Sequence, residues 1–174
     1  MGPKPGTAEG TIIAFEDPSC PSCRRFEAVV LPKLKRGLVD PGRVSFVYRN
    51  VHAVRDWAEY ATLALETVYA RDAAAFWELK SYYFQHQPDV TTQNVEARTR
   101  EFLDASSLDA ASVRREIESG THRPALRTDV QAAETAGVQG TPTFFLFDAG
   151  ADVGRILGPQ PYSVFAKLLG VDDG

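Results

Sequence analysis

The spacing of apolar residues changes along the chain, and its first part alternates between strand and helix. Residues 11–17 begin with an apolar, partly β-branched run that predicts a buried strand, and residues 44–48 form a second such run. Between them, residues 19–38 carry apolar side chains at intervals of three and four, which predicts a helix that Pro32 kinks. The opening of the chain is therefore expected to form a strand–helix–strand unit.

Helical spacing dominates the middle of the chain and predicts four or five helices between residues 54 and 136. After Gly137 the strand pattern returns. Residues 143–147 are rich in aromatic side chains, and residues 153–157 are expected to form their antiparallel partner. A last helix is predicted over residues 161–169.

These patterns predict an α/β protein with a central mixed sheet, in the order βαβ…ββα, interrupted by an all-helical subdomain. Residues 1–10 are rich in Pro and Gly and are expected to be a flexible tail. The sheet domain is discontinuous and consists of residues 11–53 and 137–170, and residues 54–136 form the inserted subdomain. The aromatic residues of this subdomain keep helical intervals, so we expect a core rather than a peptide groove: Trp57, Tyr60, Trp77, Tyr82, Tyr83 and Phe84.

The composition indicates a globular protein with a substantial core, because 44% of its 174 residues are hydrophobic and 24% are charged. The formal net charge is −4 and Lys and Arg are scattered, so no nucleic-acid partner is expected. No apolar run approaches the ~18–20 residues that a membrane span needs.

The two cysteines of the chain, Cys20 and Cys23, lie where the first strand passes into the first helix. Free backbone N–H groups and the positive end of the helix dipole favour the thiolate at this place. Cys20 is at the helix start, so we expect it to be the attacking residue. Cys23 lies one turn further in, on the apolar side, and is expected to be the resolving thiol. The position of the pair therefore points to thiol–disulfide chemistry.

Two other roles for the cysteine pair are less consistent with the sequence. A static disulfide would close so short a loop that it would restrain little of the unfolded chain. A zinc site would need further ligands, and His52, His86 and His122 show no metal-binding spacing. We therefore expect no bound metal.

Four features occur in one order: a strand, Cys20-Pro21-Ser22-Cys23 at a helix start, a helical insertion, and Gly140-Thr141-Pro142-Thr143 before a ββα ending. Together they resemble the DsbA-like thiol–disulfide oxidoreductases, which have a thioredoxin fold with a helical insertion. The resemblance covers residues 11–169. The CxxC pattern alone is a weak indication, but its combination with the Gly-Thr-Pro-Thr segment is specific.

The resemblance implies roles for the second motif and for the partners. It implies that Pro142 follows a cis peptide bond and packs against the cysteine pair, and that the Thr141 backbone binds an extended client segment by strand addition. It also implies client proteins that contain thiols, and a membrane oxidase that re-oxidises the pair. We expect no organic cofactor, because the cysteine pair is the redox centre, and we expect a monomer.

Several neighbours are expected to tune the thiolate of Cys20. Within the active-site loop, Pro21-Ser22 offers the Ser22 hydroxyl and backbone N–H groups, and Arg24 is expected on the helix face of Cys20, where it would favour the thiolate. Glu16 and Asp17 would act in the opposite direction if they pointed towards the sulfur. This balance predicts a moderate oxidant rather than an extreme one.

The sequence departs from the family pattern at Ala14. Many relatives carry a buried acidic residue six positions before the first cysteine, which accepts the proton of the inner thiol. Here either Glu16 or a water molecule takes that role, or Cys23 is deprotonated less efficiently. A glutamate at a strand end is more often solvated than catalytic.

The leading hypothesis is a DsbA-like oxidoreductase that introduces disulfides into exported proteins. One alternative is a thiol reductase or disulfide isomerase kept reduced by a partner. Another is a non-redox binding or chaperone module. The first ten residues lack the apolar stretch of a signal peptide. We expect an exported or membrane-anchored protein whose targeting segment is absent from this chain, with a cytoplasmic protein as the alternative.

Overall fold

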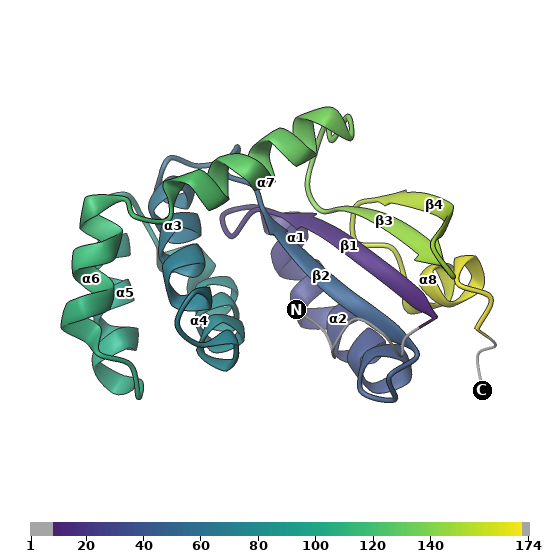
Figure 1. The fold of residues 1–174 in the computed structure, drawn as a ribbon, viewed down its shortest axis with the longest axis horizontal. Coiled ribbons are helices and arrows are strands. Elements are labelled where there is room, and N and C mark those ends of the chain that lie inside the picture. Colours follow the sequence, from purple (N-terminus) through teal and green to yellow (C-terminus); the bar gives the residue numbers. More distant parts are fainter. Residues whose placement is uncertain (1–8, 172–174) are drawn as a thin grey trace.

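A mixed sheet of four strands forms the centre of the computed structural model, which describes residues 9–171 (Figure 1). The strand order is β2-β1-β3-β4, with β1 parallel to β2 and the other two pairs antiparallel. The strands are β1 (Gly10–Glu16), β2 (Val44–Asn50), β3 (Thr143–Asp148) and β4 (Ala151–Leu157). This confirms the predicted fold class.

The predicted flexible tail, residues 1–10, is too long at its C-terminal end. Gly10 pairs with Val44 and Asp148, so it belongs to β1, and the strand ends at Glu16 instead of Asp17. Residues 1–8 lie outside the described residues. The three-part domain division stays a prediction.

The segment after β1 is helical from residue 21 to residue 39, but it is not a regular α-helix. Proline has no N–H, so Pro32 leaves the carbonyl of Ala28 without its usual partner. The preceding turn is widened, and the Leu31 N–H bonds to the Phe26 carbonyl, five residues back. The predicted irregularity therefore lies in the turn before Pro32. The segment consists of α1 (Pro21–Arg25), η1 (Phe26–Val30), α2 (Leu31–Leu34) and η2 (Lys35–Val39).

The helical insertion stands beside the sheet, and its last helix runs back over the sheet end towards β3 (Figure 1). Its elements are α3 (Trp57–Tyr69), α4 (Ala73–His86), the short η3 (Gln87–Asp89), α5 (Val95–Ala105), α6 (Ala110–Ser119) and α7 (Arg123–Thr135). The final helix of the chain is α8 (Tyr162–Leu168).

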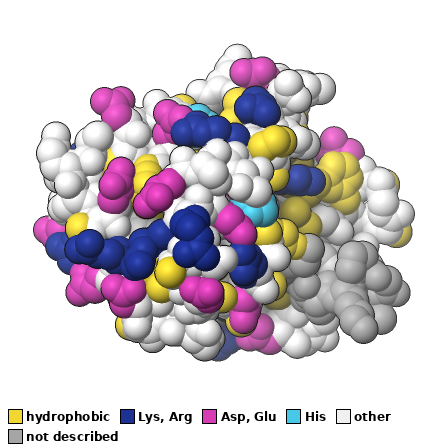
Figure 2. Space-filling model, turned by 60° about the vertical axis from the view of Figure 1, so that its left-hand side comes forward, with side chains coloured by type: hydrophobic (Ala, Val, Ile, Leu, Met, Phe, Trp, Pro, Cys, Tyr) yellow, Lys and Arg dark blue, Asp and Glu magenta, His cyan; other side chains and the backbone are white. Residues whose placement is uncertain are grey.

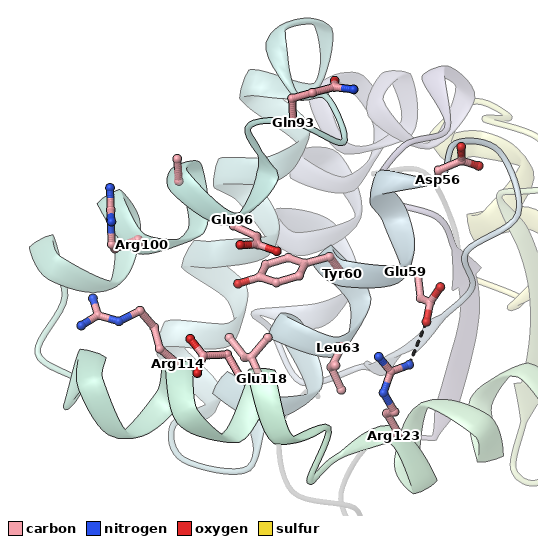
Figure 3. Close-up of a pocket in the computed structure, with 12 residues that line it drawn as sticks. Asp56, Glu59, Tyr60, Leu63, Gln93, Glu96, Arg100, Arg114, Glu118 and Arg123 are labelled. Carbon is pink, nitrogen blue, oxygen red and sulfur yellow. Dashed lines mark hydrogen bonds and ion pairs between the residues drawn. The ribbon is translucent and has the colours of Figure 1, made fainter.

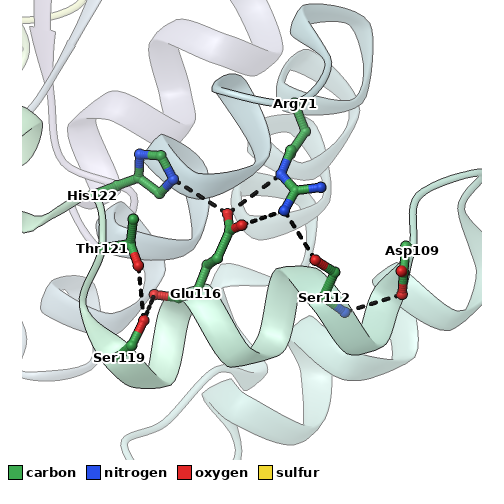
Figure 4. A network of polar contacts seen from close by, with 7 residues as sticks. All are labelled: Arg71, Asp109, Ser112, Glu116, Ser119, Thr121 and His122. Carbon is green, nitrogen blue, oxygen red and sulfur yellow. Dashed lines mark hydrogen bonds and ion pairs between the residues drawn. The ribbon is translucent and has the colours of Figure 1, made fainter.

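Polar contacts connect the helices of the insertion to each other and the insertion to the sheet. Arg71, between α3 and α4, pairs with Glu116 of α6, and His122 Nε2 lies 3.3 Å from the same carboxylate (Figure 4). At the edge of the sheet, Asp129 of α7 accepts from Arg49 Nη1 and from the Asn50 backbone N–H, each at 2.8 Å. The contacts of Asp129 hold α7 against β2.

Buried aromatic rings fill the space between the sheet and the helices that cover one of its faces. Phe26 lies 4.5 Å from Phe144 and 6.1 Å from Phe165, measured between ring centroids, and its side chain is fully buried. In the insertion, three of the six aromatic residues named above are buried, which confirms the core expectation for Trp57, Tyr83 and Phe84. The other three are half-buried.

The visible surface of the insertion carries charges of both signs. On the face in Figure 2, Lys and Arg side chains lie beside Asp and Glu rather than alone. Among residues 9–171, no helix has the length and apolar character that crossing a membrane requires.

The Phe26 ring gives a direct test of the core. We expect Phe26→Ala to lower the free energy of unfolding by about 3–5 kcal/mol, because it removes a fully buried ring and leaves a cavity. Val29→Ala, on the same helical segment but 54% exposed, should change it by less than about 0.5 kcal/mol. Urea unfolding measures both. Equal losses in the two variants would contradict this packing.

Candidate active site

Cys20 is the N-cap residue of α1. Its backbone is extended, with φ −80° and ψ 122°, and its carbonyl accepts the first helical hydrogen bond from the Arg24 N–H at 3.1 Å. Pro21 follows at the first helical turn, where its missing N–H leaves no hydrogen bond unmade. The predicted location of the cysteine pair at a helix start is therefore confirmed.

Asp17 organises the loop that leads to Cys20. Its buried carboxylate accepts from the backbone N–H and hydroxyl of Ser19, at 2.7 and 2.6 Å. It also accepts from the backbone N–H groups of Ala53 and Val54, at 2.8 and 2.9 Å. The sequence suggested an unfavourable charge beside the sulfur. The structure shows instead a carboxylate that holds two loops together.

The second motif reaches the first cysteine from a distant part of the chain. The Thr141–Pro142 peptide bond is cis, as the resemblance implied. The Cys20 thiol donates to the Thr141 carbonyl with a sulfur–oxygen distance of 3.3 Å, across 121 positions of sequence. The two motifs therefore form one site.

The two sulfurs have opposite environments. A hydrogen bond from Cys23 is the main factor that lowers the pKa of Cys20 to about 5, with help from the backbone N–H groups of Cys23 and Ser22. Burial is the main factor that raises the pKa of Cys23, and the neighbouring Cys20 and Glu16 add to it. Cys20 is 7% exposed and Cys23 is fully buried, so Cys20 is more enclosed than the sequence suggested.

The expectation that Glu16 is solvated is wrong, because its side chain is fully buried. Side chains alternate along a strand, so Glu16 lies on the same face of β1 as Ile12 and Ala14, which are also fully buried. Burial is the main factor that raises the pKa of Glu16 well above its ordinary value. This period of two was the signal in the sequence that could have placed Glu16 inside.

The counter-ion of Glu16 is Lys80, which sequence reasoning did not single out. Lys80 Nζ lies 3.8 Å from Glu16 Oε1 and also pairs with Glu27, and its side chain is only 1% exposed. Four aromatic rings surround the ammonium group, at 4.7 to 6.0 Å from their centroids: Tyr48, Trp77, Phe84 and Phe46. The signal that could have found it is helical spacing, because Lys80 lies four residues from both Phe76 and Phe84.

Arg24 does not contribute to the site in the expected way. Its side chain is exposed, and the largest influences on the Cys20 pKa come from Cys23, burial and Thr141. Arg24 lines a small groove between α4 and the helical segment that begins after Cys20, which we call the active-site helix (α1 and η1). Pro21 and Ser22 are exposed, and Ser22 acts through its backbone N–H.

A larger hollow of about 770 Å³ lies in the insertion, away from the cysteines (Figure 3). Tyr60 points into it, and Arg123 Nη1 donates to Glu59 Oε1 at 2.7 Å at one side. No group of three or more His, Cys, Asp or Glu residues within 9–171 is arranged to hold a metal ion. His86 bonds to the Tyr82 carbonyl and His122 to Glu116.

Comparison with known proteins agrees with this geometry. A family model described as thioredoxin matches residues 6–153. Disulfide bond formation protein D of Bacillus subtilis is 27% identical over 140 residues, which are 79% of this chain and 63% of that protein. The chain therefore spans less than two thirds of the length of this curated relative.

Solved structures share the whole architecture. Oxidised BdbD from Bacillus subtilis superposes with a TM-score of 0.82 at 24% identity, covering 94% of this chain and 89% of that chain. Wolbachia pipientis alpha-DsbA1 gives a TM-score of 0.79 at 16% identity, covering 98% and 92%. The family match covers most of the sequence and the superpositions include the helical insertion, so the chain belongs to the thioredoxin family and has a DsbA-like fold.

Proposed function

We propose that the protein is a thiol–disulfide oxidoreductase that introduces disulfides into proteins outside the cytoplasm. The observation that carries the proposal is the asymmetry of the cysteine pair. Cys20 has a pKa of about 5 and touches Thr141, whereas Cys23 is buried and its pKa is raised. A relative named disulfide bond formation protein D supports the same direction.

The reaction begins with a disulfide between Cys20 and Cys23. A client thiolate attacks Cys20 Sγ, the internal S–S bond breaks, and Cys23 leaves as a thiolate that takes up a proton. A second client thiolate then attacks the client sulfur of the mixed disulfide and releases Cys20 as a thiolate. The client loses two electrons and the pair gains them. The low pKa of Cys20 makes it a good leaving group in the last step.

Glu16 is the proposed proton carrier for Cys23. A buried Cys23 thiolate is unfavourable, since burial raises its pKa, and Glu16 is an electrostatic neighbour with a raised pKa of its own. A carboxyl that keeps its proton at a higher pH can deliver it to the leaving sulfur and take it back during re-oxidation. The positive charge of Lys80 acts against burial and lowers the pKa of Glu16.

The partners follow from this cycle. Clients are proteins with cysteine thiols, and the Thr141 backbone would bind the extended segment around the client cysteine. A membrane oxidase would accept the two electrons from the reduced pair. The cycle needs no metal or organic cofactor, because the sulfur atoms carry the electrons, and the protein would act as a monomer.

Trapping of the mixed disulfide tests the proposed function. We expect Cys23→Ala to remain joined to a client with a single cysteine when its Cys20 is first activated as a mixed disulfide with a small thiol, because neither Cys23 nor a second client thiol can then break the mixed disulfide. Cys20→Ala should form no such adduct. Non-reducing electrophoresis of both variants with a reduced, unfolded client measures this. An absence of adducts with Cys23→Ala would overturn the proposal.

The pH dependence of alkylation tests the thiolate. The rate at Cys20 of the reduced protein should rise to a plateau with a midpoint near pH 5. Cys23→Ala should move the midpoint upward, because it removes the hydrogen bond that does most to lower the pKa of Cys20. The folded state binds fewer protons than the unfolded state between about pH 5 and 9, so Cys20 should make the reduced protein more stable as the pH rises through this window.

The reduction potential separates an oxidase from the alternative reductase. We expect a value well above about −200 mV, because a thiolate with a low pKa stabilises the reduced pair. A value near about −270 mV would favour the reductase. Equilibration with glutathione, followed by acid quenching, gives the potential directly.

Replacement of the buried carboxyl tests the proton step. We expect Glu16→Gln to slow closure and opening of the internal disulfide by at least about tenfold, because it cannot carry the proton. The pH profile of that step should lose the ionisation assigned to Glu16. Glu78→Gln, on the exposed side of α4, is the matched control, and its rate and pH profile should equal those of the parent. An unchanged rate and pH profile in Glu16→Gln would exclude this role.

A further inference from the structure

A groove between the active-site helix and α4 lies directly beside the cysteine pair. Its volume is about 310 Å³, enough for one or two side chains. Phe84 lies in its lining and forms one buried cluster with Cys20 and Cys23, so the groove adjoins the redox site. We call it the α1–α4 groove, lined by Arg24, Glu27, Ala28, Ser81, Phe84 and Gln85.

The charges of the α1–α4 groove are not balanced. The Glu27 carboxylate is engaged by the buried Lys80, and Ser81 and Gln85 are neutral. Arg24 is exposed and forms no ion pair with any other residue in the described range, 9–171. The groove therefore offers one uncommitted cation beside an aromatic ring.

We propose that the α1–α4 groove receives an acidic side chain of the client, and that Arg24 pairs with its carboxylate. The proposal rests on the proposed function and identifies a class of client. A guanidinium fork suits a carboxylate, which it binds through two parallel hydrogen bonds. The preferred client carries Asp or Glu near its reacting cysteine.

The reach of Arg24 sets the distance between the client cysteine and the acid. Arg24 follows Cys20 by one helical turn, about 6 Å along the axis. An extended client advances about 3.3 Å per residue, so the acidic residue lies about two positions from the cysteine. Both positions, before and after the cysteine, are tested below.

A second role for Arg24 makes different predictions. If Arg24 stabilised the Cys20 thiolate, its loss would raise the Cys20 pKa and affect all clients alike. The geometry favours recognition, because Arg24 is exposed and the main groups that lower this pKa are Cys23, Thr141 and Ser22.

Oxidation rates of short cysteine peptides test the proposal. The peptides carry Glu, Gln or Lys two positions before or after the cysteine and are otherwise identical, and the second-order rate constant for the reaction of each peptide thiol with the oxidised protein is measured at low salt. In the parent protein, the Glu peptide should react about threefold faster than the Gln peptide when the acid is at one of the two positions, before or after the cysteine. An exposed ion pair allows an effect of this size. The ratio should fall with added salt. Arg24→Gln should bring it to about one, and Arg24→Glu should favour the Lys peptide.

Two controls separate the outcomes. Arg25→Gln removes the adjacent exposed arginine, which does not line the groove, and should keep the Glu preference. The alkylation midpoint of Arg24→Gln should equal that of the parent. Equal rates for all peptides in the parent, or a preference that survives in Arg24→Gln, would overturn the inference. A shifted midpoint with an equal loss on every peptide would assign Arg24 to the thiolate instead. If the parent oxidised none of the peptides, the proposed function itself would fail.

Discussion

The antiparallel pairing of β1 with β3 is the constraint on which the site depends. Phe15 lies opposite Thr143, so the end of β1 and the start of β3 meet at one edge of the sheet. Cys20 follows the first strand and Pro142 precedes the other, and this brings Cys20 Sγ within 3.3 Å of the Thr141 carbonyl. A slip of two residues in this register would separate the motifs by about 7 Å and abolish the contact.

The two cysteine side chains are identical but differ in their surroundings, and this difference shifts their pKa values in opposite directions. Both cysteines lie in the first turns of one helix, but Cys23 faces the sheet and Cys20 faces Thr141. Hydrogen bonds to Cys20 favour its thiolate, and the apolar surroundings of Cys23 favour its thiol. Of the two sulfurs, that of Cys20 is therefore the better leaving group.

The helical insertion contributes side chains to the surroundings of the cysteine pair. The buried charges come from three elements: Glu16 from β1, Glu27 from the active-site helix, and Lys80 from α4. An unpaired ammonium in this aromatic environment would cost several kcal/mol, so the glutamates and the insertion stabilise each other's positions. The same helix supplies Phe84, which belongs to one buried cluster with the two cysteines and borders the α1–α4 groove.

Local patterns were sufficient for most of the fold. The order of strands and helices follows from apolar spacing, and the family motifs identified Cys20, Cys23 and the cis peptide bond before Pro142. Errors of one residue arose at the ends of β1, because Gly10 pairs through its backbone and offers no side-chain signal. The irregular turn before Pro32 also needed the structure, since proline indicates a disturbed helix but not how it is accommodated.

The sequence by itself determined the element order and the position of the cysteine pair at a helix start, because both depend on spacing within short segments. The environment of the charged residues was decided only by the tertiary structure. Glu16 is buried because a helix covers its face of β1, Lys80 meets it because α4 packs there, and Arg24 remains exposed at the edge of the α1–α4 groove. The ionisation of a side chain depends on every element that surrounds it, and those elements are distant in sequence.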